Sequence, residues 1–92
     1  MAEFLVYGVT SVPEGVDPER VKELRAGERD RAMELRAAGH LKRLWRIPGK
    51  WGTVGLYEAV DATELHDLLA SLPMWPYTEM RVEPLAQHPQ ER

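Results

Sequence analysis

The 92-residue sequence contains no cysteine, which excludes disulfide bonds, thiolate nucleophiles and cysteine-ligated zinc. No segment approaches the roughly 18 apolar residues needed to span a membrane, and no signal-peptide pattern is present. Basic residues are also in the minority, with 12 Lys and Arg against 15 Asp and Glu. Because proteins that bind phosphate backbones concentrate positive charge, we expect no nucleic-acid partner. These absences together favour a cytoplasmic protein without a membrane partner.

Several catalytic motifs are missing as well. The three histidines, His40, His66 and His88, are scattered and have no second ligand at the spacing of a metal site. There is no glycine-rich phosphate loop, no GxSxG motif and no Ser-His-Asp set that spacing would indicate. If the chain is an enzyme, we therefore expect it to use acid and base groups alone, with no cofactor and no metal.

The composition that remains is that of a small folded protein. Hydrophobic residues make up 43% of the chain and charged residues 29%, as in ordinary globular proteins. We expect residues 1–92 to form a single domain. A chain of this length buries only a modest core, so association with further copies would contribute to its stability.

The pattern of apolar and turn-forming residues predicts six elements. The four strands and two helices alternate as β-α-β-β-α-β, over residues 3–10, 18–38, 40–47, 52–58, 62–72 and 77–83. Asp17 and Asp61 are the expected N-caps of the two helices, and Gly39 is the expected C-terminal cap of the first. This order is typical of the ferredoxin-like α+β fold, an antiparallel four-stranded sheet with two helices on one face. The opposite face must then be polar or covered.

Strict alternation within 40–47 predicts two faces for this strand. One face would carry Leu41, Arg43, Trp45 and Ile47, and the other Leu44 and Arg46. We expect Trp45 to pack within the sheet. Later in the chain, the two prolines of LPMWPY hold Trp75 and Tyr77 in place, either on the core or beside a pocket or subunit contact.

The first predicted helix has a carboxylate in its apolar stripe. Glu28 lies seven residues after Val21 and seven before Leu35, on the face that should be buried. Burying an unpaired carboxylate is costly, so Glu28 should either pair with Arg25 or Arg31 or face a polar cavity. In the second case partial burial would raise its pKa, as suits a general base. The helical pattern alone leaves both alternatives open.

Several motifs, in this order, resemble the muconolactone isomerase family over nearly the whole chain. They are Val-Asp-Pro at 16–18, LWRI at 44–47, LHDLLASLPMWPY at 65–77 and His-Pro at 88–89. The resemblance implies a ferredoxin-like fold, no cofactor, and a homo-oligomer in which dimers assemble into a larger ring, commonly a decamer.

The same resemblance implies a reaction and the residues that perform it. The substrate would be a small lactone, muconolactone, which becomes 3-oxoadipate enol-lactone in the β-ketoadipate pathway of aromatic catabolism. A base removes the ring proton at C4, charge spreads through a dienolate, and the proton returns at C2. The family's catalytic glutamate falls on Glu28. Arg25 and Arg46 are candidates for binding the carboxymethyl group of the substrate.

One departure from the family lies at the start of the third predicted strand. The family carries a tyrosine and an asparagine where this chain has Trp51 and Thr53, so these two residues would shape a different lactone site. Three hypotheses follow. The chain is an isomerase of the muconolactone type, or a relative that acts on another lactone or polyketide-type cyclic intermediate as isomerase, dehalogenase or cyclase. The third hypothesis is a non-catalytic small-molecule binding module.

Overall fold

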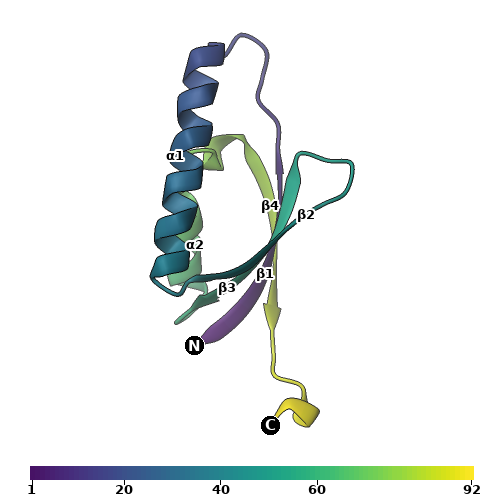
Figure 1. Ribbon diagram of the computed structural model, residues 1–92. Helices are drawn as coiled ribbons and strands as arrows, with labels where there is room; N and C mark the ends of the chain where they lie inside the picture. The colour runs from purple at the N-terminus through teal and green to yellow at the C-terminus, as the bar shows by residue number, and fades with distance from the viewer.

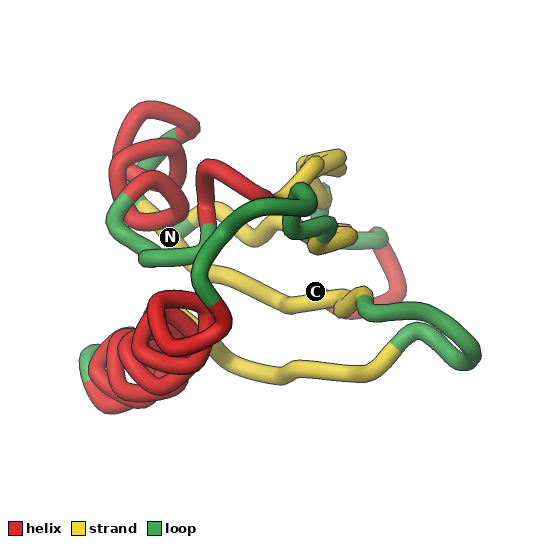
Figure 2. The backbone as a smooth tube through the Cα atoms, turned by 90° about the horizontal axis from the view of Figure 1, so that it is seen from above, coloured by secondary structure: helices red, strands yellow, loops and turns green.

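The computed structural model describes all 92 residues and contains the expected elements in the expected order. They are β1 (Ala2–Thr10), α1 (Pro18–Ala37), β2 (Leu41–Arg46), β3 (Gly52–Ala59), α2 (Ala62–Ala70), β4 (Thr78–Leu85) and the short 3-10 helices η1 (Trp75–Tyr77) and η2 (Pro89–Glu91). The strands form one antiparallel sheet in the order β2-β3-β1-β4. Both helices lie on the same side of this sheet (Figure 1, Figure 2). The ferredoxin-like α+β fold is therefore confirmed.

Both helices begin at the aspartates that the sequence indicates. The N–H of Glu19 donates to the carboxylate of Asp17 at 2.9 Å, and the N–H of Glu64 donates to Asp61 at 2.9 Å. Each aspartate thus satisfies one of the N–H groups that the first helical turn leaves without a partner. These local contacts fix where α1 and α2 start.

Helix α1 ends in a Schellman motif centred on a glycine. Gly39 has a φ of +84°, a backbone conformation that side chains other than glycine rarely adopt. Its N–H donates to the carbonyl of Arg36 at 3.0 Å, and the N–H of His40 donates to the carbonyl of Leu35 at 2.9 Å. The chain therefore turns directly from α1 into β2. This tight turn fixes the C-terminal end of α1 beside the sheet.

The hydrophobic core lies between the helices and the sheet. Its buried members come from β1, the C-terminal half of α1, β2, β3, α2 and the turn after α2, and they are Phe4, Val6, Leu35, Leu41, Tyr57, Ala59, Leu65, Leu69 and Leu72. Helix α2 contributes Leu65 and Leu69, four residues apart on one helical face. Helix α1 contributes only one fully buried residue, Leu35, so much of its sheet-facing surface borders open space.

Strand β2 departs from strict alternation. A register shift between Leu41 and Arg43 marks a bulge, which brings Leu41 and Leu44 onto the same, helix-facing side of the sheet. The expectation that Leu41 shares a face with Trp45 is therefore wrong. Leu41 is buried in the core, whereas Trp45 lies on the opposite face and is 43% exposed. There its ring contacts the guanidinium group of Arg43, 5.1 Å from the ring centroid.

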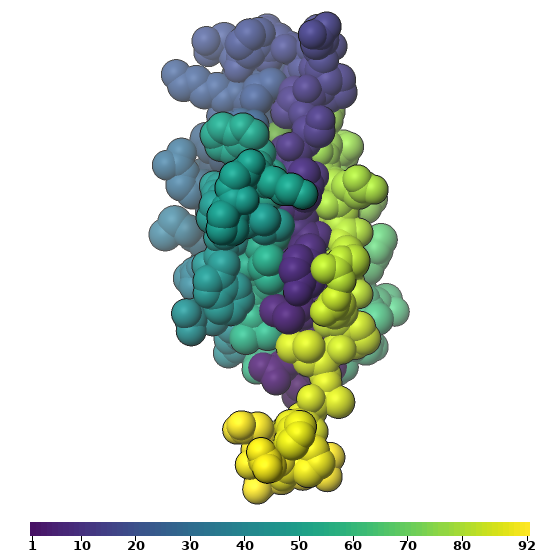
Figure 3. Space-filling model, turned by 90° about the vertical axis from the view of Figure 1, so that its right-hand side faces the viewer, coloured from purple at the N-terminus to yellow at the C-terminus, as the bar shows by residue number.

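The second face of the sheet has no helix against it (Figure 3). It mixes apolar and charged side chains, among them the partly exposed Val9, Trp45 and Leu85. The guanidinium carbon of Arg81 lies 4.0 Å from the centroid of the Tyr7 ring on this face. Neither helix is both long enough and apolar enough to cross a membrane.

Candidate active site

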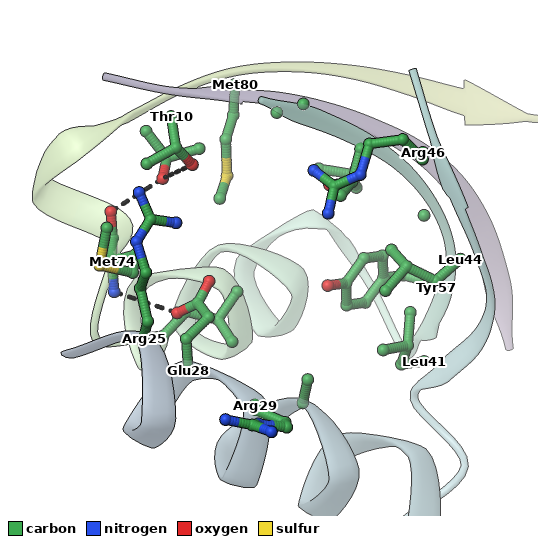
Figure 4. A pocket seen from close by; sticks show the side chains of 18 of the residues that line it. Thr10, Arg25, Glu28, Arg29, Leu41, Leu44, Arg46, Tyr57, Met74 and Met80 are labelled. Carbon is green, nitrogen blue, oxygen red and sulfur yellow. Dashed lines mark hydrogen bonds between the residues drawn. The ribbon is translucent and has the colours of Figure 1, made fainter. Parts of the chain in front are cut away.

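A cavity of about 430 Å³ lies between α1 and the helix-facing side of the sheet (Figure 4). This volume is in the range of pockets that bind small molecules. The five site residues expected from the sequence all line it, and they are Arg25, Glu28, Arg46, Trp51 and Thr53. Residues from α1, β2 and β3 are thus brought together, although 28 positions separate the first from the last.

Glu28 points from the middle of α1 into this cavity (Figure 4). Its carboxylate accepts a hydrogen bond from the N–H of Met74 at 3.0 Å and takes part in no salt bridge. Arg31 pairs instead with Glu34 at 2.8 Å, and Arg25 forms no ion pair at all. The alternative in which Glu28 makes an ordinary ion pair is therefore wrong.

Burial raises the pKa of Glu28 above its ordinary value, because the charged form loses hydration in the cavity wall. The hydrogen bond from Met74 opposes this effect by stabilising the carboxylate. A carboxyl group with a raised pKa is well matched to taking up and returning a proton near neutral pH. The environment of Glu28 therefore suits a general base.

The N–H that binds Glu28 is held in place by the segment after α2. Met74 is buried, and its carbonyl accepts a hydrogen bond from the hydroxyl of Thr78 at 2.8 Å. The Thr78 hydroxyl also lies 3.2 Å from that of Thr10 on β1 (Figure 4). Because Pro73 further restricts this segment, the backbone of Met74 is fixed between α1 and the sheet.

The aromatic residues of LPMWPY do not line the cavity. Trp75 lies outside it and packs edge-on against His66, with ring centroids 6.1 Å apart. Tyr77 is also absent from the lining. The segment contributes to the site through Leu72 and Met74 and not through its aromatic rings.

Two arginines flank the indole of Trp51 at the mouth of the cavity. The guanidinium carbons of Arg25 and Arg46 lie 5.5 and 5.7 Å from its ring centroid. Trp51 is 70% exposed, so the aromatic ring orders two long cationic side chains at the surface. Neither arginine pairs with a carboxylate of the chain. Both guanidinium groups are therefore free to bind an anionic ligand.

Positive charge predominates in the lining, in contrast to the net charge of −3 of the whole chain. Glu28 is the one carboxylate in the lining. Four arginines border the cavity, and they are Arg25, Arg29, Arg36 and Arg46. The sequence interpretation missed Arg29 and Arg36. Their spacing could have identified them, because positions 25, 29 and 36 are four and seven residues apart and share one helical face. The cavity is suited to a small anion.

Tyr57 is a further lining residue that the sequence interpretation missed. It lies on the same face of β3 as Thr53, which the two-residue period of a strand would have indicated. No group of three or more His, Asp or Glu side chains lies close enough together to bind a metal ion.

The raised pKa of Glu28 predicts that this residue lowers stability at neutral pH. In the unfolded chain it titrates near 4.5, and in the folded chain higher. At a pH between these two pKa values, the carboxyl group is ionised in the unfolded chain but still protonated in the folded chain. The free energy of unfolding therefore falls as the pH rises from the lower pKa to the higher one, and it stays lower above both. Glu28→Gln should therefore melt a few degrees higher than the wild type at about pH 7 and nearly alike at about pH 3.5.

Thermal melts followed by circular dichroism at both pH values measure this difference. Glu23→Gln is the matched control, since Glu23 is an exposed residue of the same helix. It should melt like the wild type at both pH values. A melting difference for Glu28→Gln that is the same at both pH values would contradict the assignment of a raised pKa.

The chain is similar to known proteins over nearly its whole length. A family model described as muconolactone delta-isomerase matches residues 2–91. The muconolactone delta-isomerase of Pseudomonas aeruginosa is 33% identical over 86 residues, which cover 94% of this chain and 90% of that protein. The enzyme of the same name from Rhodococcus opacus is 33% identical over 88 residues, covering 96% and 95%.

Solved structures give the same result. A crystal structure of muconolactone isomerase matches with a TM-score of 0.88 and 32% identity, covering 95% of this chain and 91% of that one. An antibiotic biosynthesis monooxygenase matches with a TM-score of 0.60 at 13% identity, which shows a shared fold alone. The chain belongs to the muconolactone delta-isomerase family and is an isomerase.

Proposed function

We propose that the protein converts muconolactone to 3-oxoadipate enol-lactone by a cofactor-free proton shift, as a step in aromatic catabolism. The observation that carries this proposal is Glu28, an unpaired, partly buried carboxylate in a cavity of suitable size. The relatives that cover nearly the whole chain bear the name of this activity. The arginine-rich lining supports a substrate that is itself an anion.

Glu28 acts as base and then as acid. Its carboxylate removes the proton from C4 of the lactone ring. The C–H electron pair forms the C3=C4 bond, the C2=C3 pair moves to C1=C2, and the carbonyl pair moves onto the oxygen to give a dienolate. The carboxyl group then returns the proton to C2 and the carbonyl re-forms. One oxygen of Glu28 is held by the N–H of Met74, so the other can carry the proton between the two carbons.

Arg25 and Arg46 would bind the carboxymethyl group of the substrate at the cavity mouth. Replacing either with Gln removes a charge-assisted hydrogen bond, so we expect KM to rise about 10-fold or more with a smaller change in kcat. Arg43→Gln is the control, because Arg43 lies on the other face of the same sheet against Trp45. Steady-state kinetics test this assignment. Unchanged KM values in both cavity variants would exclude it.

Trp51 and Thr53 favour a second candidate function. Where the family carries a tyrosine and an asparagine, this chain has a larger indole at the mouth and a single hydroxyl inside. The pocket would then accept a differently substituted lactone or a polyketide-type cyclic intermediate. A purely non-catalytic binding module is less well supported, because that hypothesis requires Glu28 to be paired and inaccessible.

A spectrophotometric assay of the purified protein with muconolactone tests the proposed function. Conversion at the rate of a dedicated enzyme would establish it. A folded protein that fails to convert muconolactone would refute it, and substituted lactones would be the next substrates to assay.

We also propose that the protein is a homo-oligomer built from dimers, up to a decameric ring. The uncovered face of the sheet supports association, since it exposes parts of Val9, Trp45 and Leu85. Light scattering after size-exclusion chromatography measures the assembly. A monomer at micromolar concentration would refute this proposal.

A further inference from the structure

Tyr57 lines the same cavity as Glu28. Its side chain is packed in the core, and the residue is only 6% exposed. Its hydroxyl nevertheless forms no hydrogen bond within the chain. Every fully buried side-chain oxygen or nitrogen of the protein has a hydrogen-bond partner, so the Tyr57 hydroxyl is not fully buried. The hydroxyl must therefore reach the open part of the cavity, and Figure 4 shows it pointing there.

Gly55 makes this position of the ring possible. A Cβ atom at residue 55 would lie 2.7 Å from Cε1 and 3.3 Å from Cδ1 of Tyr57, and the first of these distances is too short for any side chain. The aromatic ring thus lies across the bare backbone of its neighbour two positions earlier on β3. One methyl group of Leu44 would lie 3.5 Å from the same Cβ. A glycine at 55 is what allows the phenol to extend over the sheet into the cavity.

Tyr57 and Glu28 reach the cavity from opposite walls. Glu28 comes from α1, whereas Tyr57 comes from β3 in the sheet across the cavity (Figure 4). A small planar ring between the helix and the sheet can contact both groups at once. The site therefore offers a base on one side of the ligand and a neutral hydroxyl donor on the other.

The hydroxyl stays protonated over the working pH range. Burial raises the pKa of Tyr57 to about 12, the nearby carboxylate of Glu28 adds to this effect, and Arg36 opposes it. A phenol in this state donates a hydrogen bond and does not act as a base.

We propose that Tyr57 is a catalytic hydrogen-bond donor to the lactone carbonyl oxygen, which becomes negatively charged in the dienolate. This inference rests on the proposed function and deepens it. As Glu28 removes the C4 proton, the electron pair that reaches the carbonyl oxygen meets the Tyr57 hydroxyl, which keeps its own proton throughout. The donor compensates for Trp51 and Thr53, which replace the polar pair of the family. Removing one donor to a developing oxyanion typically lowers kcat by roughly 10²- to 10³-fold.

Tyr57→Phe tests the proposal, because it removes the hydroxyl and keeps the ring that fills the core. We expect kcat for muconolactone to fall by roughly 100-fold while KM changes only a few-fold. Gly55→Ala keeps the hydroxyl but displaces the ring, so it should lower kcat as well. Tyr7→Phe is the matched control and should leave kcat unchanged, since Tyr7 lies on the uncovered face against Arg81. An active wild type and an equally active Tyr57→Phe would overturn the proposal.

A binding experiment separates this inference from the proposed function. Tetronate is a five-membered ring enolate that resembles the dienolate. Muconolactone with its ring double bond reduced is a saturated lactone that resembles only the substrate. Both can be titrated by tryptophan fluorescence, since Trp51 lies at the mouth. Tyr57→Phe should weaken tetronate binding about 10-fold and leave the saturated lactone nearly unaffected. If the wild type does not isomerise muconolactone, the proposed function fails, and equal tetronate binding in both proteins would overturn the role of Tyr57 independently.

Discussion

Glu28→Gln is expected to lower kcat for muconolactone by roughly 10²- to 10⁴-fold without unfolding the protein. Glutamine has nearly the same size as glutamate, and its amide oxygen can still accept the hydrogen bond that Met74 donates at 3.0 Å. It cannot accept the ring proton, so only the proton transfer is lost. KM should change little, because Arg25 and Arg46 remain in place. A steady-state absorbance assay of both proteins measures the two constants.

The control for this prediction is Glu23→Gln, the same substitution on the exposed side of α1. It should keep the kcat of the wild type. Glu28→Asp adds a graded test, since it keeps the carboxylate but shortens the side chain, and we expect an activity between those of the wild type and Glu28→Gln. Full activity in Glu28→Gln would rule out Glu28 as the base.

The fold could be predicted from the sequence because its signals are local. The caps at Asp17, Asp61 and Gly39 are each recognised by residues within a few positions, and the structure confirms all three. The placement of Glu28 is also local, since the helical period alone puts position 28 on the face toward the sheet. Local periodicity therefore singles out position 28, whereas the role of base comes from the resemblance to the family.

Other features of the site depend on contacts that no local pattern encodes. The partner of Glu28 is the backbone N–H of Met74, 46 residues away, and any residue type offers such a donor. The bulge after Leu41 reverses the face that strict alternation assigns to this residue. The hydroxyl of Tyr57 enters the cavity only because its ring lies across Gly55. Each of these features requires the packed structure.

Leu35→Ala is expected to lower the free energy of unfolding by about 2 to 5 kcal/mol. Leu35 is 2% exposed and is the only fully buried residue of α1, so its removal leaves a cavity at the main attachment of this helix to the core. Small domains have about 5 to 15 kcal/mol of stability in total, so the loss is a large share. Urea denaturation at neutral pH measures the change.

Val60→Ala is the control for this loss, because it removes methyl groups from a side chain that is 63% exposed in the turn between β3 and α2. It should cost about 1 kcal/mol or less. Leu35 lies two helical turns after Glu28 on the same face. At neutral pH the free energy of unfolding should rise in Glu28→Gln, which removes a partly buried charge, and fall in Leu35→Ala, which leaves a cavity. If Leu35→Ala costs no more than Val60→Ala, the attachment of α1 cannot depend on Leu35, and the position of Glu28 must be held chiefly by its hydrogen bond from Met74.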